Sequence, residues 1–313
     1  MENDLLRWFQ RALPAHERLV LGAGDDAAVI KIAVGMQLVA TTDTLMDGVD
    51  FVVGQHDPAQ IGHKALAVNL SDLAAMAAKP VAALVSLCLP KNGGESLAKR
   101  LYEGILPLAS TFDCSIAGGD VNSWDGPLVV TVTALGEVRP GREWRRSGAL
   151  PGDLILVTGS FGGSILGKHL TFKPRVAEAL WLAEQLPVHA AIDVSDGLSL
   201  DLWRLAESSG IGACLDLPQV PIADAALALA KQQGQKSSLK HAPLEHALGD
   251  GEDFELILAV GQEAATEFFR RHPDWKARLS PIGHFCDKPG LWSIEPNGLR
   301  PLKPRGWEHP LDA

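Results

Sequence analysis

The stretch PAQIGHKALAVNLSDLAAMAA, residues 58–78, predicts a long helix that is apolar on nearly every side. Pro58 is a typical first helical residue, and Lys79-Pro80 ends the pattern. Apolar residues recur at helical spacing, namely Ile61, Ala65, Leu66, Leu70, Leu73, Ala74 and Ala77. Asp72 lies inside this apolar stretch, where a buried carboxylate is costly unless it is paired or bound to a metal. Lys64 is the alternative partner, and an ion pair with it would make Asp72 a structural residue.

Strands and helices alternate on both sides of this helix. The strands that we expect are residues 38–42, 81–89, 114–117, 128–138, 154–158, 191–194 and 254–260, and the further helices are residues 96–112 and 199–208. Gly118-Gly119-Asp120 is interpreted as a turn between two of these strands, and residues 139–153 as a turn-rich joint. We therefore expect an α+β protein of two α/β sandwich domains, residues 1–140 and 141–313.

The bulk composition excludes several classes of protein. Apolar residues make up 46% of the 313 residues, which is enough for a sizeable core. Lys plus Arg number 28 against 38 Asp plus Glu, and a net charge of -10 argues against generic nucleic-acid binding. The most apolar stretch, residues 81–89, is too short to span a membrane, and residues 1–13 form an amphipathic pattern instead of a signal peptide.

The four cysteines are scattered along the chain, at Cys88, Cys114, Cys214 and Cys286. No two of them have the spacing of a Cys-x-x-Cys motif. Free thiols in a reducing cytoplasm are therefore expected instead of disulfides or a zinc site, and the expected location is cytoplasmic.

Short aspartate clusters follow apolar runs at four other places. They are Gly24-Asp25-Asp26, Thr41-Thr42-Asp43, Gly118-Gly119-Asp120 and Asp193-Val194-Ser195-Asp196-Gly197. Carboxylate and hydroxyl oxygens are the ligands that Mg²⁺ prefers, and glycine lets a backbone approach a phosphate closely. Each cluster taken singly is also explained by a polar turn or a helix cap. Gly251-Glu252-Asp253 is equally consistent with a solvated turn.

One glycine-rich segment imitates a phosphate-binding loop. Residues 162–168, GGSILGK, fit the GxxxxGK pattern, but His169 stands where that loop needs Ser or Thr for Mg²⁺. We interpret the segment as a turn and a helix start.

Taken together, the segments resemble the thiamine-monophosphate kinase family, of the superfamily of aminoimidazole ribonucleotide synthetase and selenophosphate synthetase. The resemblance spans nearly the whole chain and rests on the ordered set of residues 22–28, 42–45, 64–76, 118–120, 146–148, 193–198 and 251–256. It implies Mg²⁺-dependent in-line transfer of the ATP γ-phosphoryl group to thiamine monophosphate, giving thiamine diphosphate and ADP. It also implies a homodimer, an N-terminal domain for ATP, Mg²⁺ and dimerisation, and a C-terminal domain with further ATP, metal and substrate contacts.

Matching positions in the family's motifs imply the roles of individual residues. The implied Mg²⁺ ligands are Asp26, Thr41, Thr42, Asp43, Asp72, Asp120, Asp193 and Asp196. The implied ATP contacts are Tyr102, Gly119, Asp120, Arg146 and Ser195, and the implied substrate contacts are Asp50, Glu252 and Trp307. Arg146, Asp43 and Asp120 are expected to act in catalysis through charge and bound metal, without a protein nucleophile. The family usually has His where this chain has Asp50.

Two alternatives remain beside this hypothesis. The first is another ATP-dependent synthetase of the same superfamily with a different small acceptor; no reactive cysteine stands in the glycine-rich start, which argues against selenophosphate synthesis. The second is a Mg-nucleotide-binding module without turnover, for which so many carboxylates would be unusual.

Overall fold

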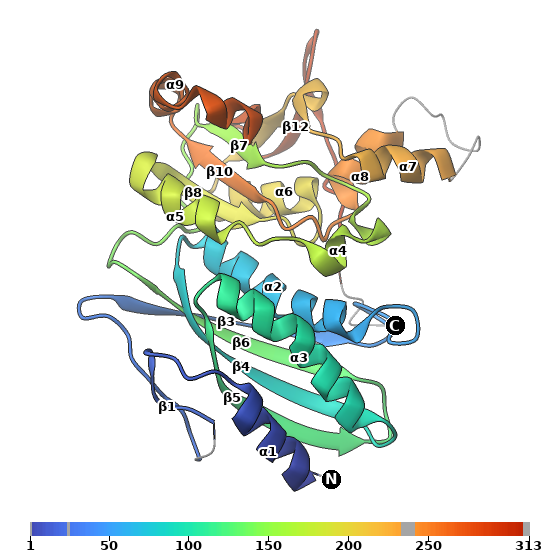
Figure 1. The fold of residues 1–313 in the computed structure, drawn as a ribbon. Coiled ribbons are helices and arrows are strands. Elements are labelled where there is room, and N and C mark those ends of the chain that lie inside the picture. Colours follow the sequence, from blue (N-terminus) through green and yellow to red (C-terminus); the bar gives the residue numbers. More distant parts are fainter. Residues whose placement is uncertain (1, 24–25, 233–241, 309–313) are drawn as a thin grey trace. The chain divides into compact units, whose positions relative to one another are not determined.

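A computed structural model describes residues 2–23, 26–232 and 242–308 (Figure 1). The chain divides into two compact units, Met1–Glu143 and Trp144–Ala313. Each unit combines a mixed sheet with helices, so the predicted α+β class is confirmed. Among the described residues, no helix is long and apolar enough to cross a membrane.

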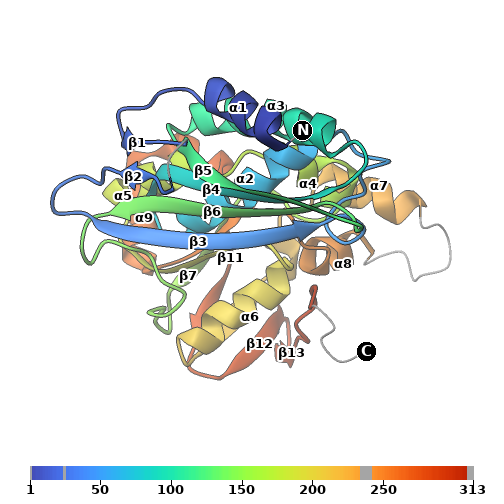
Figure 2. The ribbon, with the colours of Figure 1, turned by 90° about the horizontal axis from the view of Figure 1, so that it is seen from below.

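The first unit is built on a four-stranded sheet in the order β3-β6-β4-β5. The strands are β3 (Gln37–Met46), β4 (Lys79–Pro90), β5 (Ser115–Trp124) and β6 (Val129–Val138), and a separate small pair is formed by β1 (Leu19–Leu21) and β2 (Val29–Ile30). β6 pairs antiparallel with both β3 and β4, whereas β4 and β5 are parallel. Figure 2 shows β3 as the outer strand of this sheet, so one of its edges has no neighbouring strand in the unit.

Helices α2 (Pro58–Ala75) and α3 (Gly94–Thr111) cover one face of this sheet (Figure 1). The predicted helix at residues 58–78 is thus confirmed, although it ends at Ala75 and Ala77 adopts a φ of 51°. The two helices approach closely at glycines. A Cβ atom at Gly104 would lie 1.7 Å from the carbonyl oxygen of Ala59, and one at Gly62 would lie 1.9 Å from that of Leu101.

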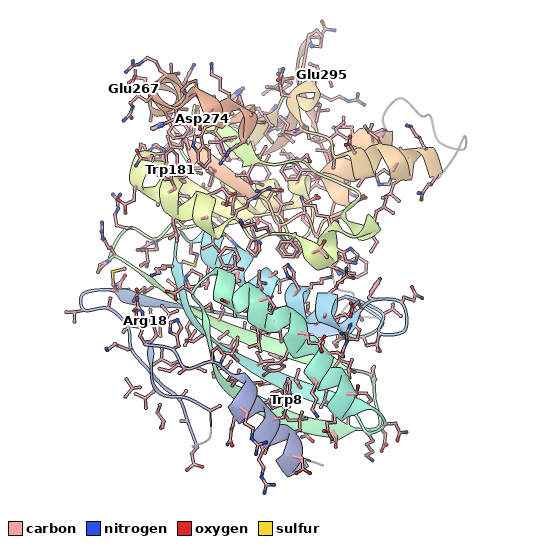
Figure 3. The ribbon with its side chains drawn as sticks, in the orientation of Figure 1. Trp8, Arg18, Trp181, Glu267, Asp274 and Glu295 are labelled. Carbon is pink, nitrogen blue, oxygen red and sulfur yellow. The ribbon has the colours of Figure 1, made fainter. Side chains whose placement is uncertain are left out.

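Helix α1 (Glu2–Ala12) packs beside α3 through aromatic rings. The ring of Phe9 lies 4.5 Å from that of Tyr102, and the ring of Trp8 lies 6.1 Å from it. After α1, the Arg18 guanidinium donates to the buried Glu137 carboxylate at 2.7 Å and joins the start of the chain to β6 (Figure 3 labels Trp8 and Arg18). These contacts of α1 and Arg18 therefore attach the start of the chain to this unit, in which Leu5 and Phe9 are buried.

The prediction of a turn at Gly118-Gly119-Asp120 is wrong, because these residues lie inside β5. A register shift places Gly118, Gly119 and Asp120 opposite Leu84, Val85 and Ser86 of β4. A Cβ atom at Gly119 would lie 1.8 Å from the carbonyl oxygen of Val85, so the close approach of the two strands itself requires glycine there. Glycine inside a strand gives the same local sequence signal as glycine in a turn.

The second unit is built on a seven-stranded sheet in the order β13-β12-β9-β11-β7-β10-β8. The strands are β7 (Leu154–Thr158), β8 (Val188–Asp193), β9 (Gly212–Leu215), β10 (Leu256–Val260), β11 (Leu279–Cys286), β12 (Gly290–Glu295) and β13 (Gly298–Pro301). All neighbouring pairs are antiparallel except β9 and β12.

Helices of the second unit cover this sheet. They are α4 (Lys168–Thr171), α5 (Val176–Gln185), α6 (Leu198–Ser208), α7 (Asp224–Gln232), α8 (Ala242–Gly249) and α9 (Gln262–Arg271), with short 3-10 turns at Ser164–Leu166, Leu217–Gln219 and Pro273–Ala277. Leu202 and Leu205 of α6 enter a core with Ile155 and Val157 of β7. Trp181 of α5, labelled in Figure 3, stacks on Trp275 with a ring separation of 4.6 Å.

Candidate active site

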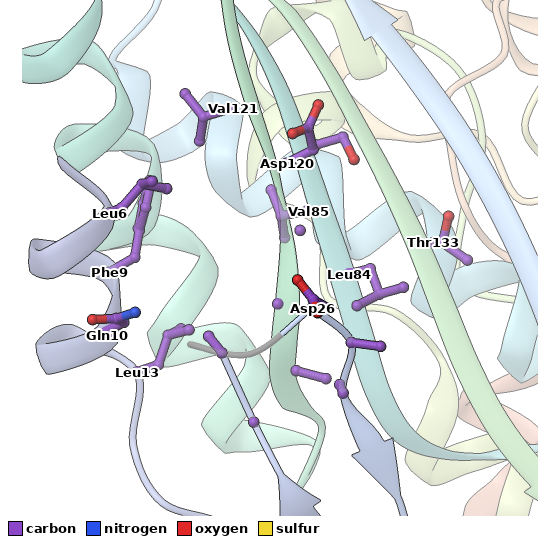
Figure 4. Close-up of a pocket in the computed structure, with 18 of the residues that line it drawn as sticks. Leu6, Phe9, Gln10, Leu13, Asp26, Leu84, Val85, Asp120, Val121 and Thr133 are labelled. Carbon is purple, nitrogen blue, oxygen red and sulfur yellow. The ribbon is translucent and has the colours of Figure 1, made fainter. Parts of the chain in front are cut away.

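A pocket of about 820 Å³ lies in the first unit, between α1, the segment that joins β1 to β2, and strands β4 and β5 (Figure 4). Four residues that the sequence implicated line it together, namely Asp26, Tyr102, Gly119 and Asp120. Gly24 and Asp25 of the same motif lie outside the described residues. The volume is within the range of about 300–1,000 Å³ that is typical of small-molecule sites.

One wall of the pocket is apolar and aromatic. Leu6 and Phe9 of α1 and Leu13 just after it, labelled in Figure 4, line it together with Tyr102 of α3. The Tyr102 side chain is 4% exposed, and burial raises the pKa of its phenol, which therefore stays neutral. An apolar wall beside two carboxylates can hold a flat ring at one end and a cation–phosphate group at the other. The α1 residues were missed because sequence analysis placed them only in an amphipathic helix.

Asp120 belongs to a polar row on the face of the sheet that α2 and α3 leave open. In register with it lie Ser86, Thr131 and Thr44, which face the same way because directly paired residues share a face. The Thr44 and Thr131 hydroxyls are 2.9 Å apart. The carboxylate thus lies beside small hydroxyl groups, a surrounding that suits Mg²⁺ and phosphate oxygens.

A second acidic group lies on the opposite face, under α2. Thr41 of β3 donates a hydrogen bond from its hydroxyl to the Asp72 carboxylate. Burial, followed by the charges of Asp72 and Asp50, raises the pKa of Asp43 to about 7. A cation bound here would relieve the repulsion between these carboxylates, so the residues fit a hard divalent ion.

Strand alternation separates the residues of β3 that the sequence grouped together. Thr41 and Asp43 face α2, whereas Thr42 faces the other way, where its hydroxyl lies 3.0 Å from that of Thr133 and 3.2 Å from the Val132 carbonyl oxygen. Within the described residues, no three His, Cys, Asp or Glu side chains form a metal-holding group. A cation at either acidic group would therefore complete its shell with hydroxyl, water or phosphate oxygens, as Mg²⁺ commonly does.

Asp50 has a structural contact that its implied substrate role did not anticipate. Its carboxylate accepts a hydrogen bond from the Met46 backbone N–H at 2.7 Å. Its carbonyl oxygen accepts one from the Lys64 ammonium, also at 2.7 Å, and Lys64 is fully buried. Asp50 thus closes the turn after β3, while its charge still acts on Asp43.

In the second unit, the Asp193–Gly197 segment joins β8 to α6. Asp193 is 4% exposed at the end of β8. The Ser195 carbonyl oxygen accepts from the Glu252 N–H at 2.7 Å, and the Asp196 carbonyl oxygen accepts from the Trp307 N–H at 2.9 Å. Backbone contacts therefore bring four implicated residues together from three distant segments, with the Trp307 ring 54% exposed beside them.

Two residues of α6 hold this segment, and sequence analysis missed both. The Asp201 carboxylate accepts from the backbone N–H groups of Asp196 and Gly197 at 2.9 and 3.2 Å. Arg204 donates to the Asp201 carboxylate at 2.8 Å and forms an ion pair with Asp196. Burial raises the pKa of Asp201 to about 6. The sequence feature that could have identified Asp201 is its place as an acidic residue in the first turn of a helix.

Arg146 lies at the other end of α6. Its carbonyl oxygen accepts from the Ser209 hydroxyl at 3.3 Å, and that hydroxyl also receives the Gly148 N–H at 3.2 Å. An 11-residue helix is about 16 Å long, so within this unit the Arg146 backbone is distant from Asp196. Its side chain is exposed.

The GGSILGK segment uses its phosphate-loop-like groups internally. The N–H groups of Gly162 and Gly163 donate to the carboxylates of Asp253 and Asp250 at 3.0 and 2.9 Å. Lys168 donates to the buried Glu255 carboxylate at 2.9 Å. The interpretation as a turn and helix start agrees with these contacts, because the groups that would hold a phosphate already hold carboxylates.

The two units match the two domains of one class of proteins. Residues 24–138 match the N-terminal domain model of AIR synthase related proteins, and residues 151–291 match the C-terminal domain model. The chain is 41% identical over 317 aligned residues to a thiamine-monophosphate kinase of Rhodopirellula baltica, covering 99% of this chain and 97% of that protein.

Solved structures of proteins in this class superpose on the chain. The thiamine-monophosphate kinase of Stenotrophomonas maltophilia K279a superposes with a TM-score of 0.78 at 32% identity, over 93% of this chain and 94% of that one. AaThiL complexed with AMPPCP and TMP superposes with a TM-score of 0.76 at 26% identity, over 98% and 96%. The chain therefore belongs to the thiamine-monophosphate kinase family, and the resemblance noted from its motifs is confirmed.

Proposed function

We propose that this chain transfers the γ-phosphoryl group of ATP to thiamine monophosphate, giving thiamine diphosphate and ADP. The observation that carries the proposal is the first unit's pocket, which gathers Asp26, Tyr102, Gly119 and Asp120 in a chain of this family. Its apolar wall suits the nucleotide base, and its carboxylates suit a cation on the phosphates. The related AaThiL was solved with AMPPCP and TMP, which supports ATP and thiamine monophosphate as the pair of substrates.

In the second unit we assign the substrate contacts to Glu252 and Trp307, beside the segment around Ser195, which we assign to ATP. Glu252 and Trp307 adjoin this segment through backbone hydrogen bonds. A carboxylate and an exposed indole suit the cationic, aromatic thiamine group, since indole faces attract cations. Glu252 adopts a φ of 55°, unusual for a residue with a side chain, and such strain is typical of functional segments.

The chemistry needs positioned charge more than a reactive side chain. Both reactants are anionic, and the attacking phosphate oxygen is already ionised near neutral pH, so neither a nucleophile nor a strong base is required. Arg146 would add a fixed positive charge. We assign Asp26, Asp43, Asp72 and Asp120 of the first unit, and Asp193 and Asp196 of the second, as Mg²⁺ ligands, and the bound ions would offset the repulsion between the phosphates. Thr41 would act by orienting Asp72 through its hydrogen bond.

The test is ATP consumption by the full-length protein with thiamine monophosphate, thiamine and an aminoimidazole ribonucleotide precursor as acceptors. We expect turnover with thiamine monophosphate and formation of thiamine diphosphate. Turnover only with another acceptor would support a different synthetase of the superfamily. Nucleotide binding without turnover on any acceptor would support a binding module.

Variants test the roles of the carboxylates. Asp120→Asn should lower kcat at least about 100-fold, because it removes a charge that acts in the transition state. The matched control is Asp125→Asn, which changes an exposed carboxylate paired with Lys91 just beyond β5. Equal activity of both variants would contradict the role of Asp120.

Asp72→Ala should reduce activity more than it reduces the melting temperature; the opposite result would favour the structural role beside Lys64.

We also propose a homodimer in which β3 takes part. This ten-residue strand forms an edge of its sheet, and its exposed residues include Leu38 and Met46. Long exposed edges with apolar side chains are normally covered. Light scattering at micromolar concentration should give twice the chain mass of 33.4 kDa. A monomer mass would contradict this proposal without affecting the kinase assay.

A further inference from the structure

Two cysteines meet on adjacent strands of the second unit, away from the residues implicated in the reaction. Cys214 of β9 is paired in register with His284 of β11, and Cys286 follows two residues later on β11. Residues two apart on a strand share a face, so Cys214 and Cys286 are diagonal neighbours on one side of the sheet. Their Sγ atoms lie 3.1 Å apart.

We propose that Cys214 and Cys286 form a reversible disulfide when the protein meets a peroxide. A disulfide has an S–S distance of about 2 Å, so closure needs a movement of only about 1 Å from the contact in the structure. Both residues belong to strands that are already hydrogen-bonded to each other, so the sheet need not rearrange.

The two sulfurs differ in access, which orders the reaction. Cys286 is partly exposed at the end of β11, whereas Cys214 is fully buried. Burial also raises the pKa of the Cys214 thiol to about 12, so it is a poor first nucleophile. The nearby Lys288 ammonium, 3.7 Å from the centre of the Trp292 ring, opposes that effect and adds positive charge close to the pair.

The proposed chemistry balances with one peroxide. The Cys286 thiolate attacks an oxygen of hydrogen peroxide, the O–O bond breaks, and Cys286 becomes a sulfenic acid as hydroxide leaves. The Cys214 sulfur then attacks the Cys286 sulfur, the S–S bond forms, and the sulfenic oxygen leaves as water with the Cys214 proton. The two thiols lose two electrons, the hydroxide takes up the proton that Cys286 released on forming its thiolate, and the peroxide is thus reduced to two water molecules.

The remaining cysteines provide internal controls. The structure describes all four thiols, and of these only Cys214 and Cys286 are in sulfur–sulfur contact. Cys88 is exposed and Cys114 is buried, so Cys88 reports oxidation of an accessible thiol that has no resolving partner. Cys88→Ser therefore gives a protein in which the pair can be followed without that background.

The experiment uses the full-length Cys88→Ser protein, reduced, freed of reductant and treated with hydrogen peroxide. Thiols that remain are alkylated after denaturation, and peptides are analysed by mass spectrometry before and after dithiothreitol. We expect Cys214 and Cys286 to lose alkylation together, to appear in one linked peptide pair, and to recover with dithiothreitol. Oxidation of Cys286 to sulfinic acid while Cys214 stays alkylated would overturn the proposal, as would full alkylation of both.

A second variant checks the order of events. In Cys214→Ala the sulfenic acid at Cys286 has no resolving thiol, so dimedone should label it at least ten times more than in the parent protein. Equal labelling would overturn the assignment of Cys214.

A third measurement needs no variant at these positions: peroxide treatment should raise the melting temperature of the parent by about 5 °C, because the bond closes the segment from residue 214 to 286. An unchanged melting temperature would count against the bond.

Discussion

The raised pKa of Asp43 has a consequence for stability in the metal-free protein. The carboxyl group has an ordinary pKa of 3.8 and a pKa of about 7 in the fold, chiefly because of burial and then because of Asp72 and Asp50. When the carboxyl group is ionised, that rise corresponds to a destabilisation of the folded state by about 4 kcal/mol, and partial solvent access to the side chain reduces this destabilisation to about 2 kcal/mol. Well below pH 3.8 both the folded and the unfolded forms are protonated at this group, so there is no effect. As the pH rises from 4 through 7, the unfolded chain releases the proton first, and the folded state loses relative stability.

Replacing Asp43 by Asn removes this penalty. In EDTA at pH 8, Asp43→Asn should have a free energy of unfolding about 2 kcal/mol higher than the parent, and the difference should vanish toward about pH 3. Urea unfolding across this pH range measures it, with Asp125→Asn as a control that should stay within about 0.5 kcal/mol. Adding Mg²⁺ should stabilise the parent more than the variant. An Asp43→Asn protein that is less stable than the parent at pH 8 would refute the reasoning.

Two further predictions concern contacts that stabilise each unit internally. Gly104→Ala should destabilise the protein by about 2 kcal/mol in thermal unfolding, although alanine favours helix by about 1 kcal/mol, because the new Cβ would meet the Ala59 carbonyl oxygen at 1.7 Å. Exposed Ser96→Ala in the same helix is the control, and equal melting temperatures would contradict the close helix contact. Glu255→Gln should lower the free energy of unfolding by about 3 kcal/mol. Arg175 donates to the Glu255 carboxylate at 2.6 and 2.8 Å, and the substitution leaves it without this buried charge partner. A loss below about 1 kcal/mol in urea unfolding would contradict this.

Most of the regular structure could be read from local patterns. The α2 helix followed from apolar spacing with Pro58 at its start, and the strands at residues 154–158 and 254–260 overlap β7 and β10. Gly118-Gly119-Asp120 could not be read in this way. Glycine is locally a turn signal, and only the neighbouring strand, with Val85 at its point of closest approach, makes it necessary inside β5.

The candidate site was predictable as a set of residues and not as an arrangement. Ordered motifs identified Asp26, Gly119 and Asp120, the family resemblance added Tyr102 on the helix before β5, and the pocket brings these four together. In the second unit, the residues outside the motifs that hold the Asp193–Gly197 segment could not be found in this way. Asp201, for example, is one of several acids near a helix start, and only its contact with the backbone of the preceding segment distinguishes it.

The sequence by itself determined the two-part α+β organisation, the family and the chemical character of an aspartate-rich phosphate site. These properties follow from local periodicity and from the residue types that recur in order along the chain. Only the tertiary structure decided which carboxylates share a surrounding. Thr41 and Asp43 meet Asp72 of α2 on one face of the sheet, while Thr42 turns to the other, because successive side chains of a strand point in opposite directions. Alternation is a local property, but the packing of α2 on the sheet decides which of the two sets lies against Asp72, and neighbouring residues in the chain do not specify that packing.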